Sequence, residues 1–150
     1  MGQSLAQIYV HVIFSTKERV ACLDPDTCRE LHPYMAEVLN NRHCPALRVG
    51  GFNDHIHFLC CLSKNLSLAD LIEAVKVPTS KWLKRQKSSL RDFHWQSGYG
   101  AFSVSASHVD RVCQYILDQD SHHRRTGFQD ELRKFFRRYK VDYDERYVWD

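Results

Sequence analysis

One stretch of the chain, residues 51–62, most strongly limits the folds that the sequence can adopt. Its sequence, Gly-Phe-Asn-Asp-His-Ile-His-Phe-Leu-Cys-Cys-Leu, is typical of a β-strand that follows a turn. Side chains alternate between the two faces of a strand, so His55 and His57 should share one face. The opposite face should carry Ile56, Phe58, Cys60 and Leu62. One face can therefore pack into a core, while the other can hold a metal ion.

The neighbouring sequence predicts three further strands. Residues 46–51 form the first arm of a hairpin, and residues 53–54 form the short turn that leads into the histidine strand. Residues 3–15 alternate between polar and apolar side chains and predict a long first strand, in which His11 is interpreted as an ordinary sheet residue. A last strand is expected near residues 101–104, after an aromatic segment that contains two glycines.

Helical patterns lie between and after these strands. An aspartate followed by proline predicts the start of a helix over residues 24–41, and a capping box predicts another that begins near Ser67. Pro78 should kink or restart this second helix, whose basic part continues to residue 86. Two more helices are expected, over about 107–122 and about 126–139.

The order strand, helix, strand, strand, helix, strand is that of a ferredoxin-like α+β fold, the plan also used by RRM domains. It predicts an antiparallel sheet with helices on one face, followed by C-terminal helices, all within one domain of residues 1–150. The other face of the sheet would then be free for a site, on the side to which His55 and His57 point.

Composition restricts the class of protein further. Hydrophobic residues make up 43% of the chain and charged residues 26%, as in ordinary globular domains. No apolar run approaches the roughly 20 residues of a membrane helix, so a soluble, intracellular protein with no membrane partner is expected. The six cysteines then indicate reduced thiols. A structural zinc protein that uses the histidines with Cys60 or Cys61 stays open as an alternative.

Basic residues gather in two parts of the sequence. The segment from Lys76 to Arg91 has six lysines and arginines and no acidic residue, and a second basic group extends from Arg124 to Lys140. Clusters of this kind are typical of proteins that contact nucleic-acid phosphates. A solvated helix face would have the same composition, and charge alone does not separate the two interpretations.

The helix over about 107–122 offers chemistry that complements the histidine pair. Two imidazoles can share an ion if a third ligand comes from elsewhere in the fold, and Gln119 is a candidate. Gln119 lies one helical turn after Tyr115, so both side chains should share one flank of the helix, beside its apolar face.

These features together resemble the single-tyrosine HUH transposases of small insertion sequences, which include the REP-associated tyrosine transposases. The resemblance covers nearly the whole chain, and its landmarks in this sequence are His11–Lys17, Asp54–His57, Ser80–Trp82, Trp95–Ser105, Tyr115–Gln119 and the pair His122-His123. Two positions depart from the family pattern, because Asn53 stands where proline is frequent and Pro78 interrupts a helix that is usually continuous. Neither departure removes a reacting group.

The resemblance implies a set of roles. His55, His57 and Gln119 would bind Mg²⁺ or Mn²⁺, and Tyr115 would attack single-stranded DNA to give a 5′-phosphotyrosine, with no nucleotide cofactor. The substrate would be the hairpin ends of the element itself, and a homodimer would share composite active sites. The protein would then work in the cytoplasm of a bacterial or archaeal cell, associated with the nucleoid. Among the basic residues, those expected to contact DNA are Lys81, Lys84, Arg85, Lys87, Arg124 and Arg125.

A second function stays open beside the transposase. A ferredoxin-like sheet with basic helices could bind single-stranded or hairpin nucleic acid without cutting it, as a domesticated transposase would.

Overall fold

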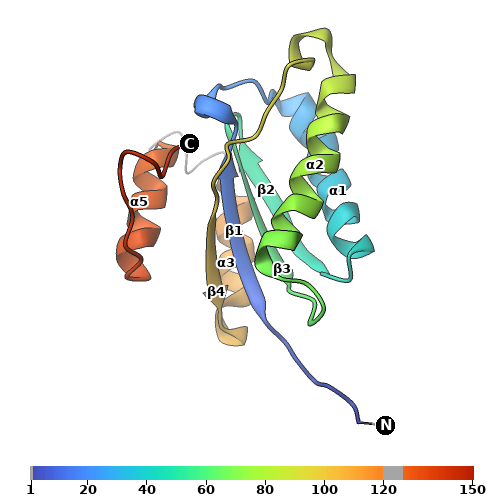
Figure 1. Cartoon of the computed structure of the whole chain (residues 1–150), viewed down its shortest axis with the longest axis vertical. Coiled ribbons are helices and arrows are strands. Elements are labelled where there is room, and N and C mark those ends of the chain that lie inside the picture. Colours follow the sequence, from blue (N-terminus) through green and yellow to red (C-terminus); the bar gives the residue numbers. More distant parts are fainter. Residues whose placement is uncertain (1, 120–126) are drawn as a thin grey trace.

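The computed structural model describes residues 2–119 and 127–150 of the chain. Its centre is a four-stranded antiparallel sheet of β1 (Tyr9–Ser15), β2 (Ala46–Phe52), β3 (His55–Cys61) and β4 (Gly100–Val104), in the order β2-β3-β1-β4. Helices α1 (Pro25–Asn41) and α2 (Leu68–Gln86) connect strands of the sheet, and α3 (Val109–Leu117) and α5 (Phe128–Arg138) follow it (Figure 1). The predicted ferredoxin-like α+β fold is confirmed.

The two faces of the sheet carry different layers. Alternate residues of β1 and β3, including Val12, Phe14, Ile56 and Phe58, pack with α1 and α2 in the largest hydrophobic cluster. The residues between them point to the other face, where they form two smaller clusters. Leu59 packs in the cluster with α3, and Ile13 packs in the cluster with α5. The alternation expected for the histidine strand is therefore confirmed, and the sheet separates a structural layer from the layer that contains His55 and His57.

Local signals explain where the first two helices begin. Asp24 is the N-cap of α1 and accepts a hydrogen bond from the backbone N–H of Thr27 at 2.7 Å, and Pro25 is the first helical residue. Ser67 caps α2 in the same way, with its Oγ accepting from the backbone N–H of Asp70 at 3.1 Å. Both starts were predicted from the sequence.

Three predicted details differ from the structure. The first strand begins at Tyr9 rather than near residue 3, because Tyr9 pairs with the ends of both neighbouring strands. Of the two alternatives expected at Pro78, a kink or a restart, the restart is absent, because α2 is one continuous helix with buried core residues on both sides of the proline. Helix α3 begins at Val109 after a 3₁₀ turn over Ala106–His108, because the Ser107 hydroxyl bonds to side chains instead of capping the helix.

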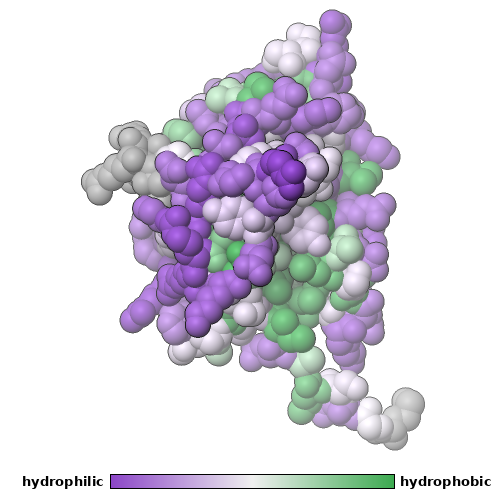
Figure 2. Space-filling model, turned by 60° about the vertical axis from the view of Figure 1, so that its left-hand side comes forward, coloured by the Kyte–Doolittle hydropathy of each residue, from purple (hydrophilic) through white to green (hydrophobic). Residues whose placement is uncertain are grey.

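The outer surface is largely polar on the side that carries α5. Figure 2 turns this side forward and shows mainly hydrophilic residues, with smaller hydrophobic areas between them. None of the described helices is both long and apolar enough to cross a membrane.

Candidate active site

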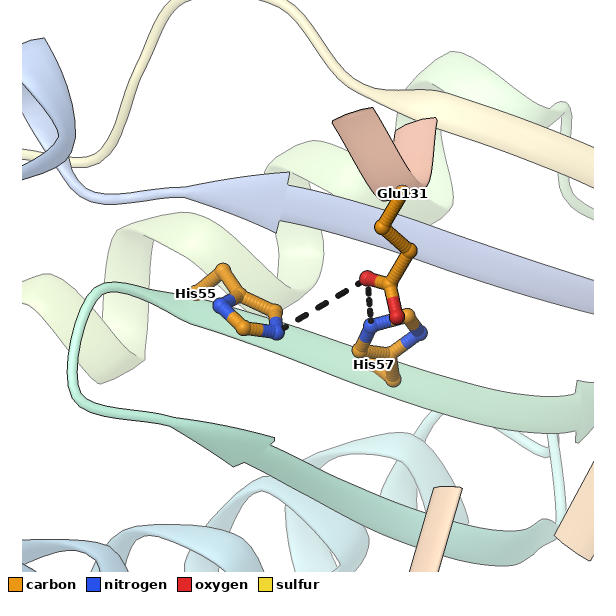
Figure 3. A group of neighbouring side chains, drawn as sticks. All are labelled: His55, His57 and Glu131. Carbon is orange, nitrogen blue, oxygen red and sulfur yellow. Dashed lines mark hydrogen bonds and ion pairs between the residues drawn. The ribbon is translucent and has the colours of Figure 1, made fainter. Parts of the chain in front are cut away.

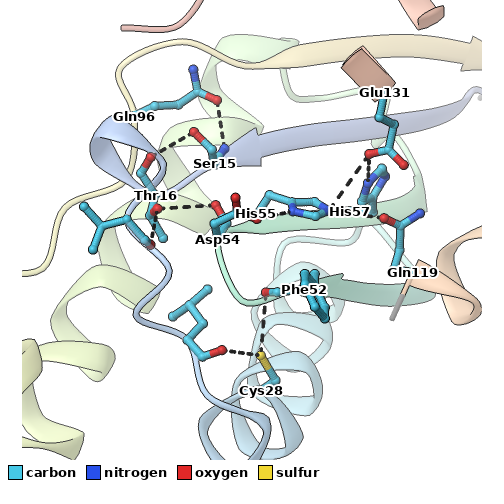
Figure 4. A network of polar contacts seen from close by, with 12 residues as sticks. Ser15, Thr16, Cys28, Phe52, Asp54, His55, His57, Gln96, Gln119 and Glu131 are labelled. Atoms are coloured by element: carbon cyan, nitrogen blue, oxygen red, sulfur yellow. Dashed lines mark hydrogen bonds and ion pairs between the residues drawn. The ribbon is translucent and has the colours of Figure 1, made fainter. Parts of the chain in front are cut away.

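The two histidines of β3 are completely buried, at 0% exposure, on the face that α3 and α5 cover. The turn before the strand is fixed to the rest of the sheet, because the carbonyl of Asp54 accepts from the backbone N–H of Thr16 at 2.9 Å. This turn also supplies a side-chain contact, with Asp54 Oδ1 2.7 Å from His55 Nδ1 (Figure 4). A carboxylate only accepts hydrogen bonds, so we assign the proton to Nδ1, which leaves His55 Nε2 directed into the site.

Gln119 lies two residues beyond the end of α3 and reaches the histidines from there. Its Oε1 lies 3.1 Å from His55 Nε2, and its amide nitrogen donates to the backbone carbonyl of Tyr115 at 3.2 Å. The side chain is 1% exposed. The structure therefore brings together His55 and Gln119, two of the three residues that the sequence suggested as metal ligands, and His57 lies on the same strand face.

Tyr115 lies over the same cluster. Its ring packs edge-on against His57, with ring centres 5.8 Å apart, and its hydroxyl donates a hydrogen bond to Glu131 Oε2. Burial of the hydroxyl, and then the negative charge of Glu131, raise the pKa of Tyr115 well above its ordinary value. The tyrosine is thus protonated in this structure, next to a group that can accept its proton.

Glu131 is a site residue that the sequence interpretation missed. It comes from α5, is 1% exposed, and places Oε1 2.9 Å from His57 Nε2 and 3.9 Å from His55 Nε2 (Figure 3). A signal was present, because Glu131 follows Phe128 by three residues and precedes Phe135 by four, on the apolar stripe of its helix. An acidic residue on a buried stripe needs a partner, and the two histidines provide it.

His11 also belongs to the site, and its interpretation as an ordinary sheet residue was incomplete. His11 pairs with Leu59 across the sheet, which makes His57 its diagonal neighbour, and His11 Nε2 lies 2.8 Å from His57 Nδ1. Burial, and then the nearby His57, hold the pKa of His11 well below its ordinary value. A neutral His11 can accept from the Nδ1–H of His57, and this leaves His57 Nε2 directed toward Glu131.

The donor atoms fit a divalent cation. His55 Nε2, His57 Nε2 and a Glu131 oxygen all lie within 4.8 Å of one another, and they form a metal-capable group in the described part of the chain. In an octahedral site with bonds of about 2.1 Å, adjacent ligands are about 3.0 Å apart and opposite ligands about 4.2 Å. The separations of 2.9, 3.1 and 3.9 Å that Glu131 and Gln119 make with the histidines are within about 0.3 Å of one or the other of these values. With the protons assigned above, each Nε2 lone pair faces an acceptor oxygen, an arrangement that a shared cation would stabilise.

A glycine on β2 lets α3 come this close to the sheet. A Cβ atom on Gly50 would lie 2.7 Å from the backbone oxygen of Ile116 and 2.8 Å from its Cγ2. Gly50 pairs with His57 across β2 and β3, so the closest approach of α3 occurs beside a candidate ligand. Only a residue without a side chain permits that approach.

The basic residues predicted to contact DNA lie elsewhere. Lys81, Lys84 and Arg85 are on α2, in the layer across the sheet from Tyr115, and Lys87 follows that helix and pairs with Asp24. The structure does not bring these four residues to the site. Helix α3 ends at Leu117, with Asp118 as its C-cap, and is shorter than the predicted helix over about 107–122. Residues 120–122 of that prediction, and Arg124 and Arg125, lie outside the described residues.

Comparison with known proteins agrees with this geometry. The family model for IS200-like transposases matches residues 4–119, a range that contains the histidine pair, Tyr115 and Gln119. The chain belongs to the IS200-like transposase family. Glu131 and the rest of α5 lie beyond the matched range. No protein in the curated set matches the chain.

Two solved structures share the fold. A candidate transposase from Deinococcus radiodurans R1, solved at 1.90 Å, is 19% identical, with a TM-score of 0.60, and the match covers 79% of this chain and 96% of the other. A REP-associated tyrosine transposase bound to a REP hairpin is 12% identical, with a TM-score of 0.58 and coverage of 82% and 74%. These two likenesses show the shared fold, and the family-model match over residues 4–119 confirms the suspected transposase family.

Proposed function

We propose that the protein cleaves and rejoins single-stranded DNA at the ends of its own element, through a 5′-phosphotyrosine on Tyr115 and with a divalent metal ion. The observation that carries the proposal is the meeting of Tyr115, His55, His57, Gln119 and Glu131 in one buried cluster. These residues come from β3, from α3 and the segment directly after it, and from α5. The strand has no structural need for two buried imidazoles.

His55, His57 and Gln119 would hold the metal, and Glu131 would be a further ligand. Two imidazoles with an amide and a carboxylate oxygen leave coordination positions open for substrate oxygens, which suits Mg²⁺ or Mn²⁺. When bound, the ion would polarise a phosphate oxygen and orient the scissile phosphate. The rival structural zinc site gains no support, because the metal-capable group in the described residues contains no cysteine, and Cys60 packs into the α1 and α2 core.

The chain's own groups account for the proton that the nucleophile must lose. Tyr115 Oη donates to Glu131 Oε2, so the carboxylate is placed to accept the proton as Oη forms its bond to phosphorus. The bond from phosphorus to the 3′ oxygen breaks, and that oxygen leaves as a 3′ hydroxyl after taking up a proton. The phosphotyrosine ester retains the energy of the broken bond, so rejoining to another 3′ hydroxyl needs no nucleotide cofactor.

Covalent capture tests the proposal. The protein is incubated with labelled single-stranded DNA from the sequence that flanks its gene, with Mg²⁺ or Mn²⁺, and a denaturant-stable adduct is sought. Tyr115→Phe should abolish the adduct, whereas Tyr147→Phe, which changes an exposed tyrosine outside the site, should leave it. Binding of the correct ends without any adduct would refute catalysis and favour a non-catalytic nucleic-acid-binding protein.

We also propose that two subunits form a homodimer that exchanges α3, so that His55 and His57 of one chain work with Tyr115 and Gln119 of the other. In the single chain these groups meet within one subunit, and only residues 105–108 join β4 to α3. Mixing His57→Ala protein with Tyr115→Phe protein under subunit exchange tests the arrangement. Recovered cleavage would establish a shared site, and continued inactivity despite proven exchange would place each site within one chain.

A further inference from the structure

A hollow of about 600 Å³ opens beside Tyr115, between the end of β4, the start of α3 and the end of α5. Its volume is typical of sites for small-molecule ligands. A smaller cavity of about 180 Å³ reaches Glu131 and Lys134, and both cavities are lined by Tyr115, Phe135 and Arg138. A strand that occupied both would therefore pass beside Tyr115.

One wall of the hollow is aromatic and held in place. Phe135 and Tyr139 are one helical turn apart at the end of α5, and both are half-buried. Each ring stacks on Phe102 of β4, with ring centres 5.3 and 4.8 Å apart and planes within 27° of parallel. Rings already fixed in this way offer a flat apolar surface at little further entropic cost, and stacking of a base on an aromatic ring contributes about 1–3 kcal/mol.

The rim of the hollow is basic. Arg111 on α3 and Arg138 on α5 are both exposed and approach it from different helices, and no acidic side chain is among the described residues that line it. Guanidinium groups match phosphate oxygens in charge and geometry. A cavity of similar volume beside α1, about 560 Å³, is lined by the acidic Asp24 as well as the basic Arg29, so its lining is not purely basic.

Polar side chains complete the lining near the start of α3. Ser105 Oγ lies 2.7 Å from His108 Nδ1, and both groups line the hollow together with Ser103. Hydroxyl and imidazole groups can donate to or accept from the edge of a base. An apolar wall, a basic rim and a few convergent polar groups are the three features that a nucleotide needs.

We infer that this hollow binds one unpaired nucleotide of the DNA strand, with its base against Phe135 and Tyr139 and its phosphates near Arg111 and Arg138. A base can enter only when it is unstacked, so the hollow selects single-stranded over duplex DNA and distinguishes bases by their edges. Its place next to the cleaved bond rests on the proposed function of Tyr115, whereas its affinity for a single strand does not.

Binding of a defined probe tests the rim. Fluorescein-labelled oligothymidylate of about 12 nucleotides is titrated over a range of salt concentrations, with fluorescence anisotropy as the measurement. Arg138→Ala should reduce the slope of log affinity against log salt by about 1. Arg137→Ala is the matched control, because Arg137 is the exposed neighbour on the same helix and does not line the hollow. Equal slopes in the two variants would overturn the assignment of the rim.

Photo-crosslinking tests the aromatic wall. The same probe with 5-iodouracil in place of thymine is irradiated, and the attached peptides are identified by mass spectrometry. Crosslinks should map to Phe135 or Tyr139, and Tyr139→Leu should lower their yield several-fold, while Tyr143→Leu, outside the hollow, should not. Thermal melts establish that both variants are folded. Crosslinks confined to residues 81–91 on α2 would overturn the proposal.

The outcomes separate this site from the proposed function. A Tyr115 adduct together with crosslinks only on α2 would refute the nucleotide site and leave the catalytic proposal intact. Crosslinks in the hollow without an adduct on the correct DNA ends would support the site and refute catalysis.

Discussion

Replacing Gly50 by alanine should disrupt the site without touching any reacting group. The added Cβ would lie 2.7 Å from a backbone oxygen of α3 that no side-chain rotation can move. Ordinary contact begins near 3.4 Å, so the helix must retreat by about 0.7 Å. Overpacking of this kind costs about 1–3 kcal/mol of unfolding free energy. In a chain of this length that corresponds to a melting temperature lower by about 2–12 °C.

The same displacement should slow the reaction. Ile116 lies between Tyr115 and Gln119 in the chain, and Gln119 follows α3 directly after its C-cap, so a retreat of the helix would lengthen the 3.1 Å contact between Gln119 and His55. A misplacement approaching 1 Å can cost about 100-fold in rate. Adduct formation on the flanking DNA would report the rate, and differential scanning calorimetry would report the stability.

Gly2→Ala is the control, since an added Cβ there meets nothing within 4 Å and Gly2 lies outside the helices and strands. A Gly50→Ala protein that melts and reacts like the unsubstituted chain would refute the close seating of α3 on β2. A lower melting temperature with an unchanged rate would refute the link between that seating and the reacting geometry.

Three other predictions concern capping, thiols and metal. Ser67→Ala removes the hydroxyl that accepts from the Asp70 N–H, so the unfolding free energy should fall by about 1 kcal/mol, and unchanged denaturant curves would contradict the cap. Burial raises the pKa of Cys60 to about 12 and that of Cys28 to about 11, so both thiols stay protonated and resist iodoacetamide at pH 8. Mass spectrometry should show that the labelled fraction of both cysteines increases as the pH is raised. Mn²⁺ at about 100 times its Kd should stabilise the fold by about 2.7 kcal/mol, which a thermal melt would show as a higher melting temperature. His57→Ala should abolish this increase, and an equal increase in the variant would place the ion elsewhere.

The fold was predictable because its signals are local. Neighbouring residues determine the alternation in β1 and β3 and the helix caps at Asp24 and Ser67. The order of the elements then leaves few topologies for a sheet of this size. Helix α2 was one exception, because the loss of one hydrogen bond at Pro78 is a local signal that burial on both sides of it outweighs.

The site was predictable only where the residues belong to a recognisable pattern. His55, His57, Tyr115 and Gln119 form such a pattern, whereas His11 and Glu131 depend on tertiary structure. The contact of His11 with His57 follows from the register between β1 and β3, which alternation alone does not determine. Glu131 required the packing of α5 against the sheet, and its place on an apolar stripe indicated only that it would be buried.

The seat of α3 bears on assembly as well as on catalysis. The backbone of Ile116 lies against Gly50, which pairs with His57 in the sheet. A helix supplied by a partner subunit would have to occupy the same place for Gln119 to reach His55. Exchange would therefore change which chain delivers Tyr115 while leaving the geometry around the histidines the same. It follows that Gly50→Ala should impair a shared site and a single-chain site alike, because the sheet that receives the helix is built by one chain in both arrangements. Single variants thus report the chemistry of the site, and mixed subunits report its assembly.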